Sequence, residues 1–409
     1  MARNVFAIIV IFLCTAIGWA ILGTTIMGRT YARGSGLEPR VASSWGSPQL
    51  QIPPSATSTR VVQKQIREVI NGQNVARTEE EAIAVALPLE RSRIRVALDL
   101  EQRKKGLLWF PTYRVAYRGE YMFRNNTPAE DVTLKLAFPA ADALYDDLVF
   151  AIDGRAIATN AVNGVVEATV RVPSGAPVRL EVGYRSQGMS TWHYSFGENV
   201  SQVRDLQLAM QTDFDAIDFP PGTLSPTTKT KTPNGWELAW RYKNLVTGSR
   251  IGMVLPEKLQ PGPLAGRISY FAPVSLLFFF FLMFIITTLR RIDLHPMHYF
   301  FLAASFFSFH LLLAYLVDHL SIHLALVICS IVSIFLVVSY LRIVIGPRFA
   351  FLEAALTQIV YLVGFSYAFF FEGFTGLAIT IGAIVTLFIV MQMTARVNWR
   401  GQAEAALAK

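Results

Sequence analysis

"FAPVSLLFFFFLMFIITTLRR", residues 271–291, is an almost unbroken apolar run that ends on two arginines. A helix needs about 20 such residues to cross the hydrocarbon core of a bilayer, because each residue advances it by about 1.5 Å. One more run of this kind precedes it and four follow, at residues 5–27, 297–317, 322–341, 349–371 and 376–393. The sequence therefore predicts a membrane protein with about six transmembrane helices.

The composition of the chain supports this interpretation. Of 409 residues, 53% are hydrophobic and only 16% are charged, a balance that soluble domains seldom have. The net charge of +8 is better explained by membrane topology than by nucleic-acid binding, because many arginines flank the apolar runs. Cys14 and Cys329 both lie inside such runs, so we expect neither a disulfide framework nor a cysteine-based zinc site.

The charges at the ends of the runs predict how the chain is oriented. The short loops on one side carry Asp318 and Glu372 and no lysine or arginine. The other side receives the cations Arg3, Arg290, Arg291, Arg342, Arg348, Arg396, Arg400 and Lys409. Because short cytoplasmic loops are enriched in Lys and Arg, we expect both termini in the cytoplasm and residues 30–268 on the outer side of the membrane, which is the periplasm in a cell that has one.

These patterns divide the chain into five expected parts. Residues 1–29 are an N-terminal transmembrane anchor, since the first run is too long for a signal-peptide core; Thr30-Tyr31-Ala32 remains as a weak cleavage site. Residues 30–90 are a flexible linker rich in Gly, Ser, Pro and Thr, followed by a short helical or irregular segment. Residues 91–268 form a periplasmic domain, 269–400 a five-helix transmembrane domain and 401–409 a cytoplasmic tail.

The domain outside the membrane shows the alternation typical of strands. Apolar residues recur at every second position, with turn sequences such as "IDGR", "PSGAP" and "TPNGW" between the runs. The alternating positions include Ile94, Val96, Leu98; Tyr113, Val115, Tyr117; Val132, Leu134, Leu136; Val178, Leu180, Val182; and Leu238, Trp240, Tyr242. Short, evenly spaced strands of this kind predict an all-β, sandwich-like domain made of antiparallel sheets that each have one wet face.

We find no catalytic pattern in this domain. Its only histidine is His193, and its acidic cluster, Asp213, Asp215 and Asp218, does not have the spacing of a calcium loop. Turn capping is the favoured interpretation of these carboxylates, with a metal site as the alternative. The aromatic group Trp192, Tyr194 and Phe196 is more simply explained by core packing than by binding of a sugar or a protein partner.

The other histidines lie in or beside the apolar runs, where polar residues are costly and often functional. His295 and His298 flank Pro296 in "LHPMHYFF" after the arginine pair. We interpret them as residues of a helix N-terminus, where proline is favoured, and expect Asp293 as a candidate cap. His319 and His323 are four residues apart beside Asp318. A four-residue spacing can bind a metal on a continuous helix. A turn is expected between these two histidines, so the spacing does not indicate a metal site here.

Two ionisable residues lie deeper in the runs. His310 has no second deep histidine with which to ligate a haem, so a hydrogen-bonded packing role is favoured. Glu353 lies near the cytoplasmic end of its run, and no series of acids crosses the membrane, which argues against a proton relay. A transporter would need His310, Glu353, Gln358 and Ser366 to line one cavity.

The C-terminal third resembles the membrane part of the CreD family of inner-membrane proteins, most clearly over residues 290–400. The resemblance is carried by Leu294-His295-Pro296, by Asp318-His319 and by Tyr340-Leu341. It is also carried by "TARVNW" at 394–399, which departs from the family pattern at Ala395 and Asn398. The resemblance implies an inner-membrane protein of Gram-negative bacteria with a periplasmic domain and a role in envelope integrity, and it supplies no catalytic residues.

We therefore expect a non-enzymatic integral membrane protein that acts through binding by its periplasmic β-domain. The alternatives are an accessory subunit of a larger membrane complex and a transporter or lipid-handling protein. The expected partners are the lipid bilayer and a membrane or periplasmic protein; no nucleic acid, cofactor or metal is expected.

Overall fold

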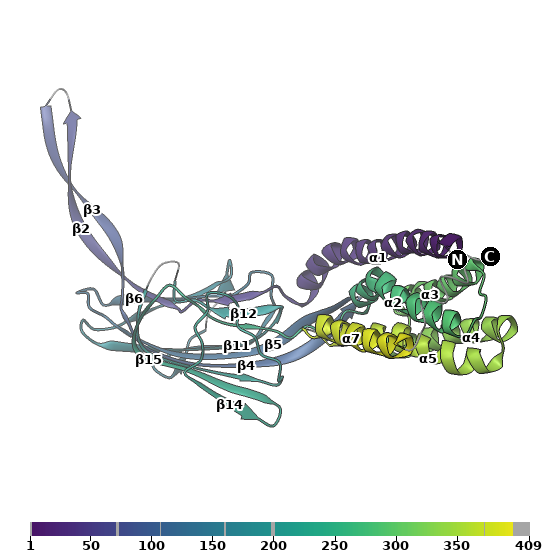
Figure 1. Ribbon diagram of the computed structural model, residues 1–409. Helices are drawn as coiled ribbons and strands as arrows, with labels where there is room; N and C mark the ends of the chain where they lie inside the picture. Colours follow the sequence, from purple (N-terminus) through teal and green to yellow (C-terminus); the bar gives the residue numbers. More distant parts are fainter. Residues whose placement is uncertain are drawn as a thin grey trace. The chain divides into compact units, whose positions relative to one another are not determined.

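The computed structural model describes residues 2–70, 73–106, 108–158, 161–197, 201–371 and 373–395 (Figure 1). The chain divides into a membrane unit, Met1–Ser35 with Leu259–Lys409, and a β unit, Gly36–Lys258. Arg396, Arg400, Lys409 and Glu372, together with the tail at 401–409, lie outside the described residues. The expected combination of apolar helices and a β-rich part is confirmed.

Six helices are long and apolar enough to cross a membrane, as predicted. They are α1 (Ala2–Trp45), α2 (Pro261–Leu289), α3 (Pro296–Leu316), α4 (Ile322–Val344), a composite fifth span and α7 (Thr375–Thr394). The fifth span consists of η1 (Phe349–Ala354), α5 (Ala355–Gln358), η2 (Ile359–Gly364), α6 (Phe365–Tyr367) and η3 (Ala368–Phe370). Because η1 and η2 are π-helical, this span departs from regular α geometry on both sides of Gln358. Such departures are frequent at functional sites.

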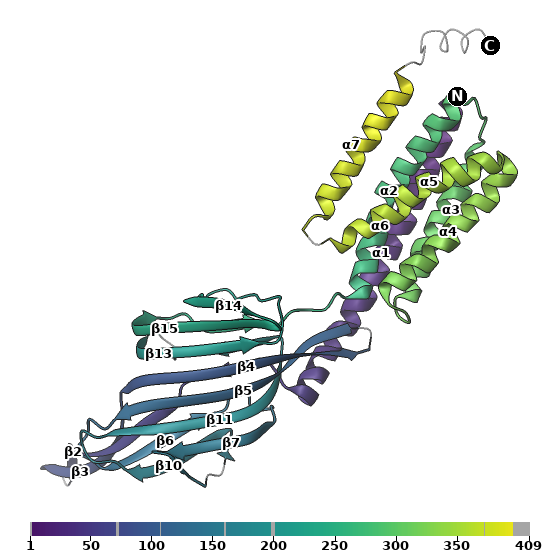
Figure 2. The ribbon, with the colours of Figure 1, turned by 90° about the horizontal axis from the view of Figure 1, so that it is seen from below.

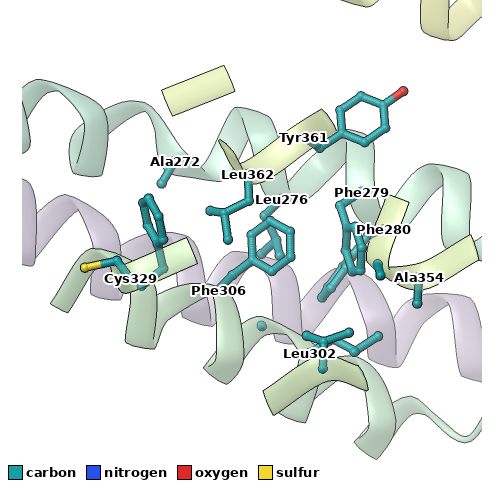
Figure 3. Packing of buried hydrophobic residues seen from close by; sticks show 14 of the residues in the cluster. Ala272, Leu276, Phe279, Phe280, Leu302, Phe306, Cys329, Ala354, Tyr361 and Leu362 are labelled. Atoms are coloured by element: carbon teal, nitrogen blue, oxygen red, sulfur yellow. The ribbon is translucent and has the colours of Figure 1, made fainter. Parts of the chain in front are cut away.

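Aromatic packing holds the helices of the membrane unit together. Figure 3 shows side chains of α2, α3, α4 and the fifth span meeting in one cluster. The rings of Phe279 and Phe306 lie 4.6 Å apart, and Phe280 meets Tyr299 edge-on at 5.2 Å. All four side chains are almost fully buried, so the Phe-rich run of α2 faces protein as well as lipid.

The β unit contains sixteen strands among its described residues. They are β1 (Gln49–Gln51), β2 (Ser55–Ile70), β3 (Gln73–Ala86), β4 (Leu89–Lys105), β5 (Leu108–Arg124), β6 (Asp131–Ala137), β7 (Tyr145–Ile152), β8 (Arg155–Ala156), β9 (Ala161–Val162), β10 (Val165–Arg171), β11 (Pro177–Met189), β12 (Thr191–Tyr194), β13 (Ser201–Thr212), β14 (Thr228–Thr232), β15 (Gly235–Thr247) and β16 (Ile251–Val254).

These strands form three sheets around one core. The largest has the order β14-β15-β13-β4-β5-β11-β7-β8, and Figure 2 shows these strands side by side. The others have the orders β3-β2-β6-β10-β9 and β1-β12-β16. All described pairings are antiparallel except β4 with β13 and β1 with β12. Leu98, Leu134 and Trp192, one from each sheet, belong to the same buried cluster, which makes the unit sandwich-like as expected.

The structure corrects the prediction for residues 30–90. Instead of a linker, α1 continues to Trp45, and Val41 is buried against Phe110 and Met189. This tertiary contact outweighs the Gly, Ser and Pro content that suggested flexibility. In the segment 61–86, expected to be helical or irregular, the described residues 61–70 and 73–86 belong to the long antiparallel hairpin β2–β3. Its described outer part has Val61 and Val62 exposed, so no alternating buried face marked it as a strand.

The two boundaries of the β unit also differ from the prediction. The unit begins near Gly36 rather than at residue 91, and it ends at Lys258 rather than 268. The second helix begins at Pro261, where proline suits the first turn because no intrahelical partner is lost there.

Candidate functional sites

His295 and His298 lie at the start of α3, as the sequence suggested. His295 itself is the cap, and its Nδ1 accepts a hydrogen bond from the backbone N–H of Met297 at 3.3 Å. Asp293, the cap suggested by the sequence, does not fill this position. His298 Nδ1 lies 2.7 Å from the hydroxyl of Tyr340, which joins the start of α3 to the last turns of α4. Both histidines thus have structural partners.

His310 is buried among aromatic rings within α3. Its Nδ1 lies 2.9 Å from the carbonyl oxygen of Phe306, and since that oxygen only accepts, the ring nitrogen is the donor. Trp19 of α1 meets the His310 ring edge-on at 5.8 Å. These contacts agree with a hydrogen-bonded packing residue.

Asp318, His319 and His323 do not converge. Asp318 forms an ion pair with Arg29 of α1 at 3.2 Å, and Arg29 also donates to the carbonyl of Ala314 at 3.0 Å. His319 lies in the turn between α3 and α4, while His323 in α4 stacks on Phe370 with ring centroids 4.9 Å apart. Within the described part of the chain, no group of three or more His, Cys, Asp or Glu residues is placed to hold a metal ion.

Glu353 has a partner that sequence reasoning did not identify. Its carboxylate lies 2.5 Å from the guanidinium of Arg290, so the pair links the end of α2 to η1. His310, Glu353, Gln358 and Ser366 are all largely buried, and no hydrogen bond or ion pair joins any two of them among the described residues.

A layer of polar contacts crosses the middle of the membrane unit. Gln358 Nε2 donates to Ser333 Oγ at 2.8 Å, and Ser333 Oγ donates to the carbonyl of Ser305 at 2.7 Å. These contacts connect the fifth span with α4 and α3. The side-chain oxygen of Gln358, Oε1, is buried and has no hydrogen-bond partner among the described atoms.

The same layer extends to two further helices, α2 and α7. Ser275 of α2 donates to the backbone carbonyl of Tyr361, and the Tyr361 hydroxyl lies 2.6 Å from Thr386 Oγ1 of α7. Each residue of the layer lies near the middle of its own helix. Single Ser, Thr and Gln residues in apolar runs carry no distinctive sequence signal, so the layer was not predicted. We call these contacts the mid-bundle layer.

The acidic and aromatic clusters of the β unit have structural roles. Asp213 accepts from the N–H of Leu100 at 2.8 Å, Asp215 pairs with Lys231 at 3.1 Å, and Asp218 accepts from the N–H of Phe219. Trp192 and Tyr194 are fully buried, which confirms core packing for both.

Buried tyrosines form a second polar cluster beneath the eight-stranded sheet. The hydroxyl of Tyr117 contacts that of Tyr121, which lies 3.5 Å from the hydroxyl of Tyr194. Tyr184 donates to Gln51 Oε1 at 2.5 Å. Burial raises the pKa of Tyr117, Tyr121 and Tyr184 well above the usual range, so these hydroxyls stay protonated and serve the core.

A hollow of about 650 Å³ lies on the other face of this sheet, the face turned away from the core. Arg95 on β4 lies directly opposite Arg118 on β5, and both side chains are exposed. Small residues flank them on the neighbouring strands, so the arginines stand beside a depression. The full row across six strands is Val149, Gly183, Arg118, Arg95, Ala209 and Ala239.

The arginines of the hollow differ in how they are paired. Arg93 is bonded through two contacts of 3.0 Å to Asp205, and hydrogen bonds from Arg93 lower the pKa of that carboxyl. The side chains of Arg95 and Arg118 have no hydrogen bond or ion pair with any described residue. Like charges directly opposite on neighbouring strands are unfavourable, so the pair of Arg95 and Arg118 does not contribute to the stability of the sheet. We call the depression around Arg95 and Arg118 the arginine hollow.

Comparison with known proteins identifies the helical part of the chain. Residues 231–400 match the family described as inner membrane protein CreD, which confirms the resemblance over that part. The chain is thus a multi-pass inner-membrane protein that carries CreD-family sequence over these residues. No curated protein matches the chain.

Similarity to solved structures is weak. A Legionella pneumophila protein described as a candidate nutrient binding protein is 10% identical with a TM-score of 0.36, covering 57% of this chain and 76% of that one. An M1 zinc metallopeptidase from Deinococcus radiodurans is 12% identical with a TM-score of 0.30, covering 42% of each chain. The chain thus spans less than half the length of that peptidase, and similarities at these scores carry no argument about activity.

Proposed function

We propose that this protein is a non-enzymatic inner-membrane protein whose β unit lies in the periplasm. There it binds an envelope component that carries an oxyanion, and the arginine hollow is the binding site. The observation that supports this most strongly is the pair Arg95 and Arg118, two opposed guanidiniums left without partners at a depression. Guanidinium groups match phosphate and carboxylate geometry, and they hold their charge at every physiological pH.

The next row of the hollow suggests what else the ligand carries. Glu120 and Glu181 lie opposite each other on β5 and β11, two residues along from the row of Arg118 and on the same face. Glu181 is paired with Arg179 at 3.1 Å, while Glu120 has no ion-pair partner among the described residues. An oxyanion next to hydroxyl or ammonium donors would satisfy both rows, a combination typical of an acidic or phosphorylated glycan.

The periplasmic placement rests on the distribution of charge at the helix ends. Arg290 and Arg291 follow α2, Arg342 lies in the last turn of α4, and Arg348 precedes η1. The short loop at the opposite ends of α3 and α4 carries Asp318, which is paired with Arg29, and no Lys or Arg. By the positive-inside rule, the arginine-rich ends face the cytoplasm and the β unit faces the periplasm.

Titration of the full-length protein in detergent tests the proposal. The probes are tripolyphosphate, which offers only phosphate oxyanions, and an oligogalacturonate, which offers only carboxylates and hydroxyls. We expect saturable binding of at least one probe and a loss of roughly tenfold or more in Arg95→Gln/Arg118→Gln, since each charged hydrogen bond contributes about 1.5–3 kcal/mol.

The matched control is Arg114→Gln/Arg185→Gln. Both arginines lie on the same sheet and are exposed, but each has an ion-pair partner, Glu101 and Asp147. This control keeps wild-type affinity if the arginine hollow is the site. Equal weakening by the two double substitutions would show that only the overall charge of the sheet attracts the probe, and it would remove the proposal.

A second function, that of an accessory subunit, is favoured by α7. Only Thr386 and Val390 of this helix are buried. Large apolar side chains cover the rest of it, namely Leu377, Ile381, Ile384, Val385, Leu387 and Phe388. Purification from native membranes followed by mass spectrometry tests this role. A stoichiometric partner lost in Ile384→Trp supports it, and recovery of the protein with lipid alone contradicts it.

A further inference from the structure

The tip of the β4–β5 hairpin combines basic and aromatic side chains near both covalent links to the membrane. Residues 103–105 and 108–110 have their strand partners within the hairpin, because the described register of β13 ends at Leu98 and that of β11 ends at Thr112. This tip carries Arg103, Lys104, Lys105 and Trp109. It therefore extends beyond the neighbouring strands of the sheet.

Contacts hold the tip to the two chain segments that lead into the membrane spans. Gln102 Nε2 donates to the carbonyl of Pro256 at 2.6 Å, and Lys105 Nζ donates to the carbonyl of Arg40 at 3.2 Å. Pro256 is five residues before Pro261, where α2 begins, and Arg40 lies in α1 itself. At 3.3–3.6 Å per residue, the chain cannot take Lys258 more than about 10 Å from the start of α2.

Two cation–π contacts fix aromatic rings at this place. The Arg103 guanidinium lies 3.2 Å from the ring centroid of Trp45, and Lys258 Nζ lies 3.9 Å from that of Trp109. Tryptophan is enriched where membrane and water meet, because its ring is apolar and its N–H is polar. The same place carries the cations Arg40, Arg103, Lys104, Lys105 and Lys258 and the acids Glu38, Glu101 and Glu257.

We infer that these five cations, with Trp45 and Trp109, bind the phosphate-bearing headgroups of anionic phospholipids at the membrane surface. We call this set the basic collar. Lys104 and Arg40 are exposed, and their side chains have no ion pair with a described residue, so they are open to lipid. The inference goes beyond the proposed function, and it shares no residue with the arginine hollow.

Hydrogen exchange of the full-length protein in nanodiscs tests the inference. One set of discs contains phosphatidylcholine alone, and the other contains phosphatidylcholine mixed with phosphatidylglycerol. We expect amides of residues 103–110 to exchange roughly fivefold more slowly in the second set, the factor that corresponds to about 1 kcal/mol for one cation near an anionic surface. Raised salt should reduce the difference, since the charges are exposed.

Arg40→Gln/Lys104→Gln removes two of the five cations and should reduce this dependence on lipid while leaving the contacts of the tip in place. The matched control is Lys229→Gln/Lys231→Gln, which removes the two cations over the Trp236 ring on β14 and β15. That pair has the same chemistry but lies outside the basic collar, so the control should retain the full dependence. Equal exchange in both lipid compositions, or an undiminished dependence in Arg40→Gln/Lys104→Gln, overturns the inference.

Discussion

The membrane unit and the outer face of the eight-stranded sheet use polar side chains in opposite ways. In the mid-bundle layer, Gln358, Ser333 and Tyr361 bond across helices, and Arg290 and Arg29 each have a carboxylate partner. On the sheet, Arg95 and Arg118 face each other unpaired. A bilayer makes unpaired polar groups costly, so the polar side chains named here are hydrogen-bonded or ion-paired within the fold, with Gln358 Oε1 as the exception among them. Water tolerates unpaired charge, and a water-exposed sheet can hold it ready for a ligand.

Replacement of a glutamine by glutamate in each region should give the largest difference in stability between the two regions. Gln358→Glu places a carboxyl group in the mid-bundle layer and should lower the stability of the membrane unit by about 2.5–3.5 kcal/mol. Gln207→Glu, on the exposed floor of the arginine hollow, should change stability by no more than about 0.5 kcal/mol.

Thiol labelling of buried Cys329 during heating reports unfolding of the membrane unit, in a Cys14→Ser background that removes the exposed thiol. Intrinsic tryptophan fluorescence in a Trp19→Phe background reports mainly the β unit, which holds five of the seven tryptophans. A tolerated Gln358→Glu would mean that water reaches the mid-bundle layer, and the transporter alternative would regain support.

Removal of an arginine should change stability in opposite directions in the two units. Arg29→Gln leaves Asp318 and the Ala314 carbonyl without their partner and should cost about 1–2 kcal/mol. Arg118→Gln relieves the repulsion with Arg95 and should stabilise the β unit by about 0.2–1 kcal/mol. Denaturant midpoints of the single variants check both signs. A destabilising Arg118→Gln would show that this arginine has a structural role.

Loss of a single hydroxyl should also lower the stability of the membrane unit more than that of the β unit, but the difference should be smaller than for the substitutions above. Ser333→Ala breaks the chain between Gln358 and Ser305 and should cost about 1 kcal/mol, since interhelical hydrogen bonds average about 0.6 and reach about 1.7 kcal/mol. Thr133→Ala removes an exposed 2.9 Å contact with Thr169 and should cost less than about 0.5 kcal/mol. Equal effects would mean that the mid-bundle layer is hydrated.

The smallest expected effect concerns pH and His193 on β12. Burial lowers the pKa of His193, and the nearby Arg250 lowers it further. The unfolded state, with a pKa near about 6.5, binds the proton more readily, so this contribution to stability is complete above that pH. It is lost as the pH falls toward the folded pKa. The denaturant midpoint of the β unit should therefore decline in acid, and His193→Gln should reduce the decline. An unchanged slope would refute this attribution.

The sequence predicts the membrane part more fully than the β unit because bilayers impose one simple requirement on a helix. Ile322, the predicted start of the fourth span, is the first residue of α4. The hairpin β2–β3 was missed because exposed strands have no buried face to set an alternation. The extension of α1 was missed because Val41 gains its partners, Phe110 and Met189, only in the folded chain.

The candidate sites also differ in how far the sequence predicts them. The helix-start role of His295 follows from local chemistry, so the sequence was sufficient to suggest it. The opposition of Arg95 and Arg118 depends on the register between β4 and β5, and their lack of partners depends on which carboxylates the fold brings near. Neither the opposition of the two arginines nor their lack of carboxylate partners can be deduced from the spacing of residues along the chain.

The central claim is that the arginine hollow binds an envelope component in the cell. A photo-crosslinking residue at Ala209, beside Arg95, tests it most directly, with the same residue at Thr133 on the five-stranded sheet as the control. The account predicts an adduct with a phosphate- or carboxylate-bearing envelope component at Ala209 alone, lost in Arg95→Gln/Arg118→Gln. No adduct at Ala209, or one that persists without the two arginines, would contradict the account.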